Sequence, residues 1–341
     1  MKNHWHRLPT NVSIPLSILD LAPIRPGGTA ADTFTESVKL AQNAEAHGYS
    51  RVWYAEHHNM ASIASSATSV LIGHIANHTK SIRLGAGGIM LPNHSPMIIA
   101  EQFGTLATLF PGRIDLGLGR APGTDQLTFQ ALRRDPRASD AFPHDVLELQ
   151  AYLGAESRIE GVNAYPGQNT NVPLYILGSS LFGARLAAQL GLPYSFASHF
   201  APDALVQATT AYRNEFRPSE FLAEPYVIAG VGVVAADTNA EAHTIMEQVR
   251  RDRIQMFLGR NRPVPFTEAE IDMLLDSSHG ENILHMLKYT AVGDGDAVAQ
   301  YLREFAKTAQ ADELITVHNS SSAAERLRSV KVTAKAMNLS A

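Results

Sequence analysis

The chain has 341 residues, 45% of them hydrophobic, with a formal net charge of −5 and a pI near 6.3. This is enough to bury a sizeable core, and it provides no basic surface for nucleic acid or a membrane. The absence of cysteine excludes disulfides, thiolate metal sites and cysteine nucleophiles. Neither a secretory signal nor an apolar run of the roughly 20 residues that span a bilayer is visible. We therefore expect a cytoplasmic protein that acts on a small molecule.

Short apolar runs alternate with helical patterns along the chain. Eight runs have the composition of buried strands, and segments with helical periodicity follow them. The strands are expected at 13–21, 51–55, 82–91, within 111–123, and at 172–177, 194–197, 226–235 and 313–317. The helices are expected at 30–47, 66–77, 97–110, 144–153, 181–190, 203–216, 239 to about 257, 296–308 and 323–337.

Eight consecutive βα units without a second compositional block predict a (β/α)₈ TIM barrel with insertions at its C-terminal face. Residues 1–12 are expected to form an N-terminal extension, and 13–341 a single domain. Two segments interrupt the rhythm, a polar, arginine-rich stretch at 124–142 and a longer one at 260–295. Because long excursions at this face are often lids or substrate loops, 260–295 is our candidate lid.

Glu56-His57-His58 follows the second expected strand, so at least one imidazole should project into the mouth of the barrel. An imidazole there suits general acid–base catalysis. The alternative is a pair of histidines hydrogen-bonded within a loop. A metal site is not expected, because His94 and His199 lack the two-His-one-carboxylate spacing of an iron or zinc centre.

Glycines gather at the carboxyl ends of the third and fourth strands. Gly87 and Gly88 leave room for a flat group to approach the backbone and permit unusual dihedral angles; a β-bulge or tight turn explains them equally well. A Gly-x-Gly-x-x-Gly dinucleotide fingerprint fails, because its third positions are Met90 and Pro122. A Rossmann dehydrogenase is therefore disfavoured.

Two elements that bind anions are expected on the same rim. Arg120 ends the fourth strand, where a guanidinium is a good ligand for phosphate or carboxylate. Gly178-Ser179-Ser180 opens a helix after the fifth strand, so free N–H groups and the helix dipole point at this rim. The serines alone are explained as N-caps. Together with Arg120 they suggest one phosphate pocket.

Four blocks in order carry a family resemblance: GYSRVWYAEHHN, GGIMLPNHSP, LFPGRIDLGLGRAPG and LGSSLFGARLAAQLGLP, which begin at Gly48, Gly87, Leu109 and Leu177. From Ile14 to about Met337 the chain resembles the luciferase-like flavin-dependent monooxygenases, the superfamily of bacterial luciferase.

The resemblance implies a TIM barrel that binds FMN at its carboxyl end. His57 matches the family's active-site histidine near the flavin, and Gly87-Gly88 falls where the family carries a non-proline cis peptide. Arg120 and the segment Gly178, Ser179 and Ser180 fall around the flavin phosphate. Gly119 replaces a cysteine of the luciferase subunit and Gly178 a carboxylate, so light emission is not expected.

The implied reaction uses reduced FMN from a separate NAD(P)H:flavin reductase together with O₂. A C4a-peroxyflavin then oxygenates a small organic substrate, which the sequence does not identify. The resemblance also implies a homodimer that pairs through the helices after the second and third strands, including 66–77, although a buried structural helix explains 66–77 equally well. Two alternatives stay open, namely an F420-dependent hydride-transfer oxidoreductase and a non-catalytic flavin-binding barrel.

Overall fold

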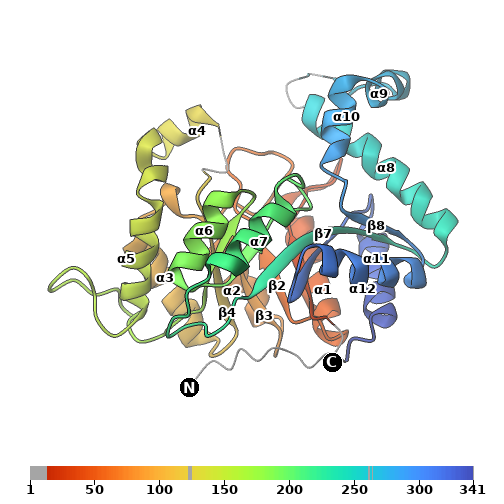
Figure 1. Cartoon of the computed structure of the whole chain (residues 1–341). Coiled ribbons are helices and arrows are strands. Elements are labelled where there is room, and N and C mark those ends of the chain that lie inside the picture. The colour runs from red at the N-terminus through yellow and green to blue at the C-terminus, as the bar shows by residue number, and fades with distance from the viewer. Residues whose placement is uncertain (1–13, 122–124, 260–261, 263, 341) are drawn as a thin grey trace.

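The computed structural model describes residues 14–121, 125–259, 262 and 264–340. Eight parallel strands form a closed barrel, and helices surround it (Figure 1). Around the ring the strands are β1 (Leu16–Asp20), β2 (Arg51–Tyr54), β3 (Arg83–Met90), β4 (Ile114–Gly119), β5 (Leu174–Gly178), β6 (Tyr194–Phe196), β7 (Val227–Ala235) and β9 (Glu313–His318). These are the eight strands that the sequence predicts, and the TIM barrel is confirmed.

Two pairings close the ring. Leu16 of β1 is in register with Leu314 of β9, and Tyr194 of β6 with Val227 of β7. A ninth strand, β8 (Thr290–Gly293), pairs with the carboxyl half of β7 and lies outside the ring. The sequence pattern did not predict β8, because its four residues are too few to show a distinct strand pattern.

The helices that follow the strands match the expected ones to within a few residues. They are α1 (Ala30–Ala46), α2 (Thr68–Asn77), α3 (Pro96–Leu109), α5 (Phe142–Leu153), α6 (Leu181–Leu190), α7 (Leu205–Glu215), α8 (Asn239–Leu258), α11 (Gly295–Thr308) and α12 (Ala323–Ala336). Among the described helices, none has both the length and the apolar character that crossing a bilayer requires.

Both excursions contain regular structure. The first holds α4 (Gln126–Ala131) and the 3₁₀ helix η2 (Pro136–Asp140), and a further 3₁₀ helix, η1 (Leu91–Asn93), follows β3. The second holds α9 (Glu268–Leu275) and α10 (Ser278–His285), which pack on α8 through Ile254, Ile271 and Ile283. Figure 1 shows α4 on one side and α8, α9 and α10 on the other, rising above the barrel.

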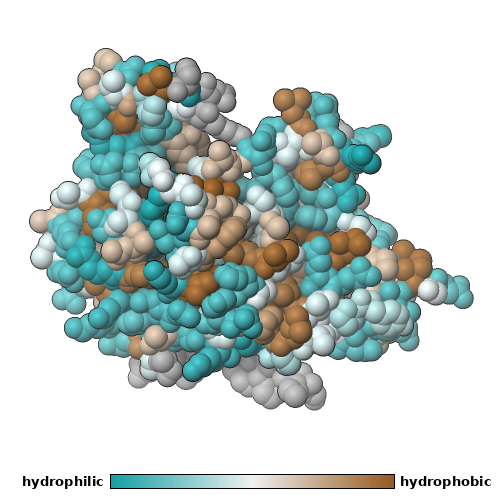
Figure 2. Space-filling model, turned by 180° about the vertical axis from the view of Figure 1, so that it is seen from behind, coloured by the Kyte–Doolittle hydropathy of each residue, from teal (hydrophilic) through white to brown (hydrophobic). Residues whose placement is uncertain are grey.

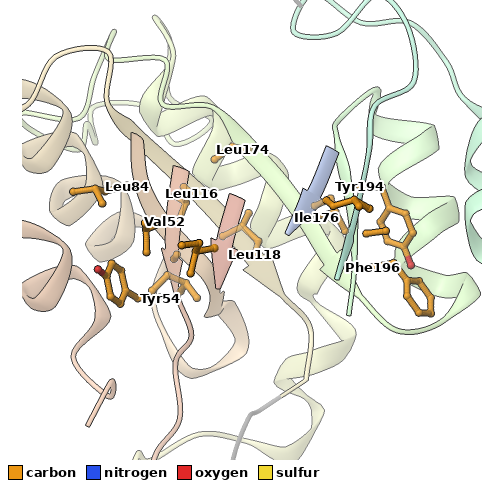
Figure 3. Packing of buried hydrophobic residues seen from close by; sticks show 14 of the residues in the cluster. Val52, Tyr54, Leu84, Leu116, Leu118, Leu174, Ile176, Tyr194 and Phe196 are labelled. Carbon is orange, nitrogen blue, oxygen red and sulfur yellow. The ribbon is translucent and has the colours of Figure 1, made fainter. Parts of the chain in front are cut away.

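The strands alternate between two apolar layers, as the two-residue period of a β-strand requires. Val52, Leu84 and Leu116 point outward into the main core under the helices (Figure 3). Trp53 and Tyr175 belong to a second cluster inside the barrel, with members from five of the eight strands. The lumen is therefore filled by side chains, and any ligand must bind above this layer.

Below the apolar layer, the amino-terminal end of the barrel holds a buried ionic network. Nη1 of Arg51 lies 2.8 Å from Oδ2 of Asp115, and its Nη2 donates to Oε2 of Glu313 at 3.1 Å. Arg83 also pairs with Asp115. Burial alone would lower the pKa of Arg51, but Glu313, Tyr175 and Asp115 hold it above its usual value. Arg51 therefore stays charged, and the network ties β2, β4 and β9 together.

Candidate functional site

Glu56 anchors the end of β2 to the end of β3. Its side chain is fully buried, and Oε2 accepts the backbone N–H of Met90 at 3.0 Å. Its Oε1 lies 2.7 Å from Nε2 of His58 and 2.8 Å from Nε2 of His94. Burial would raise the pKa of Glu56, but the hydrogen bonds from His58 and His94 lower it below its usual value. Glu56 is therefore an ionised carboxylate that fixes the rim.

His57 has different surroundings from its neighbour His58. Its backbone is fixed, because its N–H donates to the carbonyl of Ser65 at 3.1 Å and Ser66 Oγ donates to its carbonyl at 2.9 Å. Its imidazole makes no hydrogen bond with any residue that the structure describes, and its Nδ1 is buried. Burial lowers the pKa of His57 below 6.5. The side chain is thus a neutral imidazole available to a ligand.

The two interpretations of the histidine pair, acid–base catalysis and hydrogen bonding within a loop, apply to different residues. His58 is hydrogen-bonded to Glu56, as the second interpretation predicts. His57 has an imidazole with no hydrogen bond to a described residue, as acid–base chemistry requires. The structure also brings His94 to Glu56 and His58, with one potential ligand atom from each lying within 4.8 Å of the others. The sequence spacing did not predict this group. The hydrogen bonds to Glu56 account for its arrangement, and we assign these residues to the rim network.

The glycines of β3 lie where its register shifts against β4, between Ala86 and Ile89. The peptide bond between Gly87 and Gly88 is cis, as the family resemblance implied. The β-bulge that was the alternative explanation for these glycines is present as well. A Cβ on Gly87 would lie 2.9 Å from Leu19 Cδ1, and one on Gly88 2.7 Å from the carbonyl oxygen of Gly117. Packing on the lumen therefore requires glycine here, and β3 reaches the mouth without side chains at two successive positions.

Arg120 lies beside the start of α6. Its guanidinium carbon is 4.1 Å from the ring centre of Phe182, in the first turn of that helix. Its Nε donates to the carbonyl of Ser139 at 3.2 Å, and the side chain remains about 42% exposed. Its Nη2 also lies 3.9 Å from Oδ1 of the exposed Asp140. The guanidinium is thus held by one hydrogen bond and one long ion pair, and it keeps N–H groups that can donate to an anion.

Ser179 and Ser180 are both exposed at the start of α6. Ser180 occupies the N-cap position, but its side chain makes no capping hydrogen bond to the described helix. Ser180 is therefore the N-cap residue, as the alternative explanation expected, but without the capping hydrogen bond, and the first N–H groups of α6 lack a side-chain acceptor from it. Gly178 is less constrained, because the nearest atom to a Cβ there would lie 3.6 Å away.

These residues share one rim of the barrel. Gly88 sits between β2 and β4, and a Cβ on it would contact both Gly117 of β4 and Leu177 of β5. His57 follows β2, and Arg120 follows β4. The imidazole, the glycine pair, Arg120 and the two serines thus lie at the carboxyl ends of β2 to β5, where barrel enzymes place their chemistry.

A family model described as luciferase-like monooxygenase matches residues 14–312, which covers every described strand except β9. This chain belongs to the luciferase-like monooxygenase family. A luciferase-like monooxygenase of Escherichia coli K12 is 47% identical over 307 residues, 90% of this chain and 92% of that protein.

Two further comparisons agree with this membership. An N-acetyl-S-alkylcysteine monooxygenase of Bacillus subtilis is 39% identical over 261 residues, 74% of this chain and 76% of that protein. The crystal structure of apo-MsnO8 superposes with a TM-score of 0.87 at 34% identity, over 96% of this chain and 99% of that one. The chain therefore has the fold of this family and belongs among its monooxygenases.

Some contacts at the site join residues far apart in the sequence, and the sequence pattern did not predict them. His94 was considered only as a metal ligand, although it completes the Glu56 network from 38 residues away. No local pattern could have found this contact. Arg253 on α8 was not singled out at all, although a cation within an apolar stripe was visible in the sequence.

Proposed function

We propose that this luciferase-like monooxygenase binds FMN and uses it, in the reduced form, to oxygenate a small organic substrate with O₂. One juxtaposition carries the proposal: an unpaired imidazole, His57, lies on the same rim as an anion site built from Arg120 and the uncapped start of α6. A flavin mononucleotide has the matching parts, a flat apolar ring and a phosphate.

The residues fit this cofactor. Arg120 and the N–H groups at Ser179 and Ser180 would hold the phosphate, because a guanidinium and a helix N-terminus both favour an anion. Gly87 and Gly88 would face the ring with their backbone, on the side away from the protein atoms that fill the place of their side chains. When bound, the reduced flavin supplies the electrons that activate O₂.

His57 is the acid–base residue in this proposal. Since burial lowers its pKa, it is neutral at physiological pH and can accept a proton at a ring nitrogen. Glu56 holds the adjoining rim through His58 and Met90, so the backbone that carries His57 is fixed. Exclusion of water from the site is the remaining requirement, because water would promote side reactions that yield no product.

The lid that we propose is narrower than the segment 260–295. It comprises α9 and α10, since β8 is part of the sheet. Nε2 of His285 on α10 lies 2.5 Å from Oδ1 of Asp203 in the loop before α7, which joins the lid to the barrel. Limited proteolysis should show α9 and α10 protected when flavin and substrate bind, and equal cleavage with and without them would contradict this role.

Flavin binding tests the proposal directly. FMN fluorescence should be quenched on titration with the protein, and Arg120→Met should weaken FMN at least about tenfold while leaving riboflavin unchanged. Arg137→Met is the matched control, since Arg137 lies in the same excursion with a side chain 85% exposed. Oxygen uptake with reduced FMN, supplied by a separate NAD(P)H:flavin reductase, then measures activity. Failure of FMN to bind the wild-type protein would overturn the proposal.

The alternatives predict other results. An F420-dependent oxidoreductase would bind F420 in preference to FMN and transfer hydride without O₂. A non-catalytic flavin-binding barrel would bind FMN, but adding reduced FMN would give no more oxygen uptake than free flavin does. Parallel titrations with FMN and F420 separate these three functions.

A further inference from the structure

Helix α8 carries a cation where its pattern calls for an apolar residue. Ala242, Ile245 and Val249 form a buried stripe that packs against Val234 of β7. Arg253 lies four residues after Val249, so the 3.6-residue period places it on the same face. The packing on Val234 directs the first part of this face toward β7. Figure 1 shows α8 rising above the carboxyl end of the barrel.

Arg253 has no partner for its charge among the residues that the structure describes. It makes no hydrogen bond or ion pair with any residue in the described part of the chain, and its guanidinium carbon lies 6.0 Å from the ring centre of Phe257. Burial lowers the pKa of Arg253. A partly buried cation with no counter-charge is costly, and an anionic ligand would remove that cost.

His199 lies within the electrostatic reach of Arg253, at the end of β6. A Cβ on Gly230 of β7 would lie 2.4 Å from its Nδ1, and Gly230 shares the inward face of β7 with Ile228 of the lumen cluster. His199 therefore sits at the top of the lumen, and its Nδ1 has no partner among the described residues. Burial, and then Arg253, lower the pKa of His199 to about 4, so it is neutral at pH 7.

This pair lies in a different sector of the mouth from the residues assigned to FMN. The residues assigned to FMN belong to the carboxyl ends of β2 to β5, whereas His199 follows β6 and Arg253 is carried by α8, which packs on β7. Large apolar side chains adjoin both, with Phe200 50% exposed and Phe257 37% exposed. Figure 2 shows the surface hollowed between the part formed by α8 to α10 and the part on the opposite side.

We propose that Arg253, beside His199, binds the carboxylate of an apolar substrate in the β6–β7 sector of the mouth. The inference rests on the proposed function, because it assigns the ring and phosphate of FMN to the other sector. The guanidinium donates to both carboxylate oxygens, while Phe200 and Phe257 contact the apolar body. Arg253 is then the residue that selects an acid over a neutral molecule of the same shape.

The test compares acids with their amides. Phenylacetate, 4-phenylbutyrate and octanoate, each with its primary amide, are titrated calorimetrically into the protein with and without FMN. At least one acid should bind the wild-type protein about tenfold or more tightly than its amide. Arg253→Met should abolish this preference and Arg253→Lys should keep part of it. Arg250→Met, a control on the same helix at a position paired with Glu247, should leave it unchanged.

Other outcomes overturn the proposal. If no acid binds more tightly than its amide, or if Arg253→Met keeps the preference, Arg253 is not the carboxylate ligand. If Arg253→Met weakens FMN but not riboflavin, Arg253 binds the flavin phosphate instead. Failure of FMN to bind the wild-type protein contradicts the proposed function alone, since acid binding without FMN is measured separately.

Discussion

His57 and His58 are adjacent in sequence, yet their imidazoles have opposite properties. The hydrogen bond to Glu56 raises the pKa of His58, whereas burial lowers the pKa of His57. A buried carboxylate thus stabilises one imidazolium, and desolvation keeps the other ring neutral. The sequence could indicate that one of the two served the site, but only the position of the Glu56 side chain identifies which one.

Replacement of His57 should affect chemistry more than flavin binding. His57→Gln removes the titratable nitrogen, so we expect the rate of substrate oxygenation to fall roughly 100-fold or more. The affinity for FMN should change less than about twofold. Stopped-flow rates and fluorescence titrations measure the two quantities. His78→Gln, an exposed position on the far end of α2, is the control, and an unchanged rate for His57→Gln would remove His57 from the mechanism.

At the scale of elements, the barrel depends on contacts that no single segment contains. Arg51 opens β2, Asp115 lies in β4 and Glu313 opens β9, so the network spans 262 positions of the sequence. These charged residues stand in strands that the sequence predicts to be buried, which indicates that each needs a partner in the fold. Their pairing depends on barrel closure, which brings β9 next to β1.

Arg51→Met should therefore destabilise the barrel. It leaves Asp115 partly paired, through Arg83, and Glu313 without its cation, and breaking a buried pair in this way costs about 3–5 kcal/mol. The free energy of unfolding from urea denaturation measures the loss. Arg250→Met breaks an exposed pair and should cost less than about 1 kcal/mol. Equal stability of the two variants would show that the network contributes little.

Lids and added strands are the elements that local patterns describe least well. α9 and α10 have eight residues each and one or two buried positions each, so their apolar stripes are too short to stand out. Their capping residues, Thr267 and Ser277, were visible signals. Packing on α8 stabilises both helices, and that packing exists only in the folded chain.

At the scale of the whole molecule, buried histidines link stability to pH. Burial lowers the pKa of His199 to about 4 and of His318 to about 3. Below a pH of about 6.5 the unfolded chain binds protons that these folded side chains do not. The free energy of unfolding therefore decreases as the pH is lowered. His57 acts in the same direction, while the raised pKa of His58 opposes it.

Urea denaturation between about pH 7 and pH 5 should show this loss, at most about 1.4 kcal/mol per pH unit for each buried histidine. His318→Leu removes one such group and should make the dependence on pH shallower, whatever its effect on stability at pH 7. The window lies above the usual pKa of carboxylates, so their protonation contributes little. A slope that is the same in both proteins would contradict the assignment to His318.

The homodimer remains a proposal, and the exposed faces of α2 and α3 support it. Val70 is 71% exposed, Ile98 46% and Leu109 64%, and Ser69 of α2 donates to Gln102 of α3 at 2.8 Å. Val70→Glu should shift the protein from dimer to monomer in sedimentation velocity. Leu127→Glu, equally exposed on α4, should leave the mass unchanged. A monomeric wild-type protein would contradict this proposal.

The amino-acid sequence by itself determined the barrel and its eight strands, because strand and helix periodicities are local properties of the chain. It also placed His57, Gly87, Gly88, Arg120 and the serines before α6 at strand ends. Only the tertiary structure decided that His94 joins Glu56, that the Ser180 side chain makes no capping hydrogen bond, and that Arg253 has no charged partner among the described residues. These facts depend on which side chains meet across many residues, and that is decided when the barrel closes.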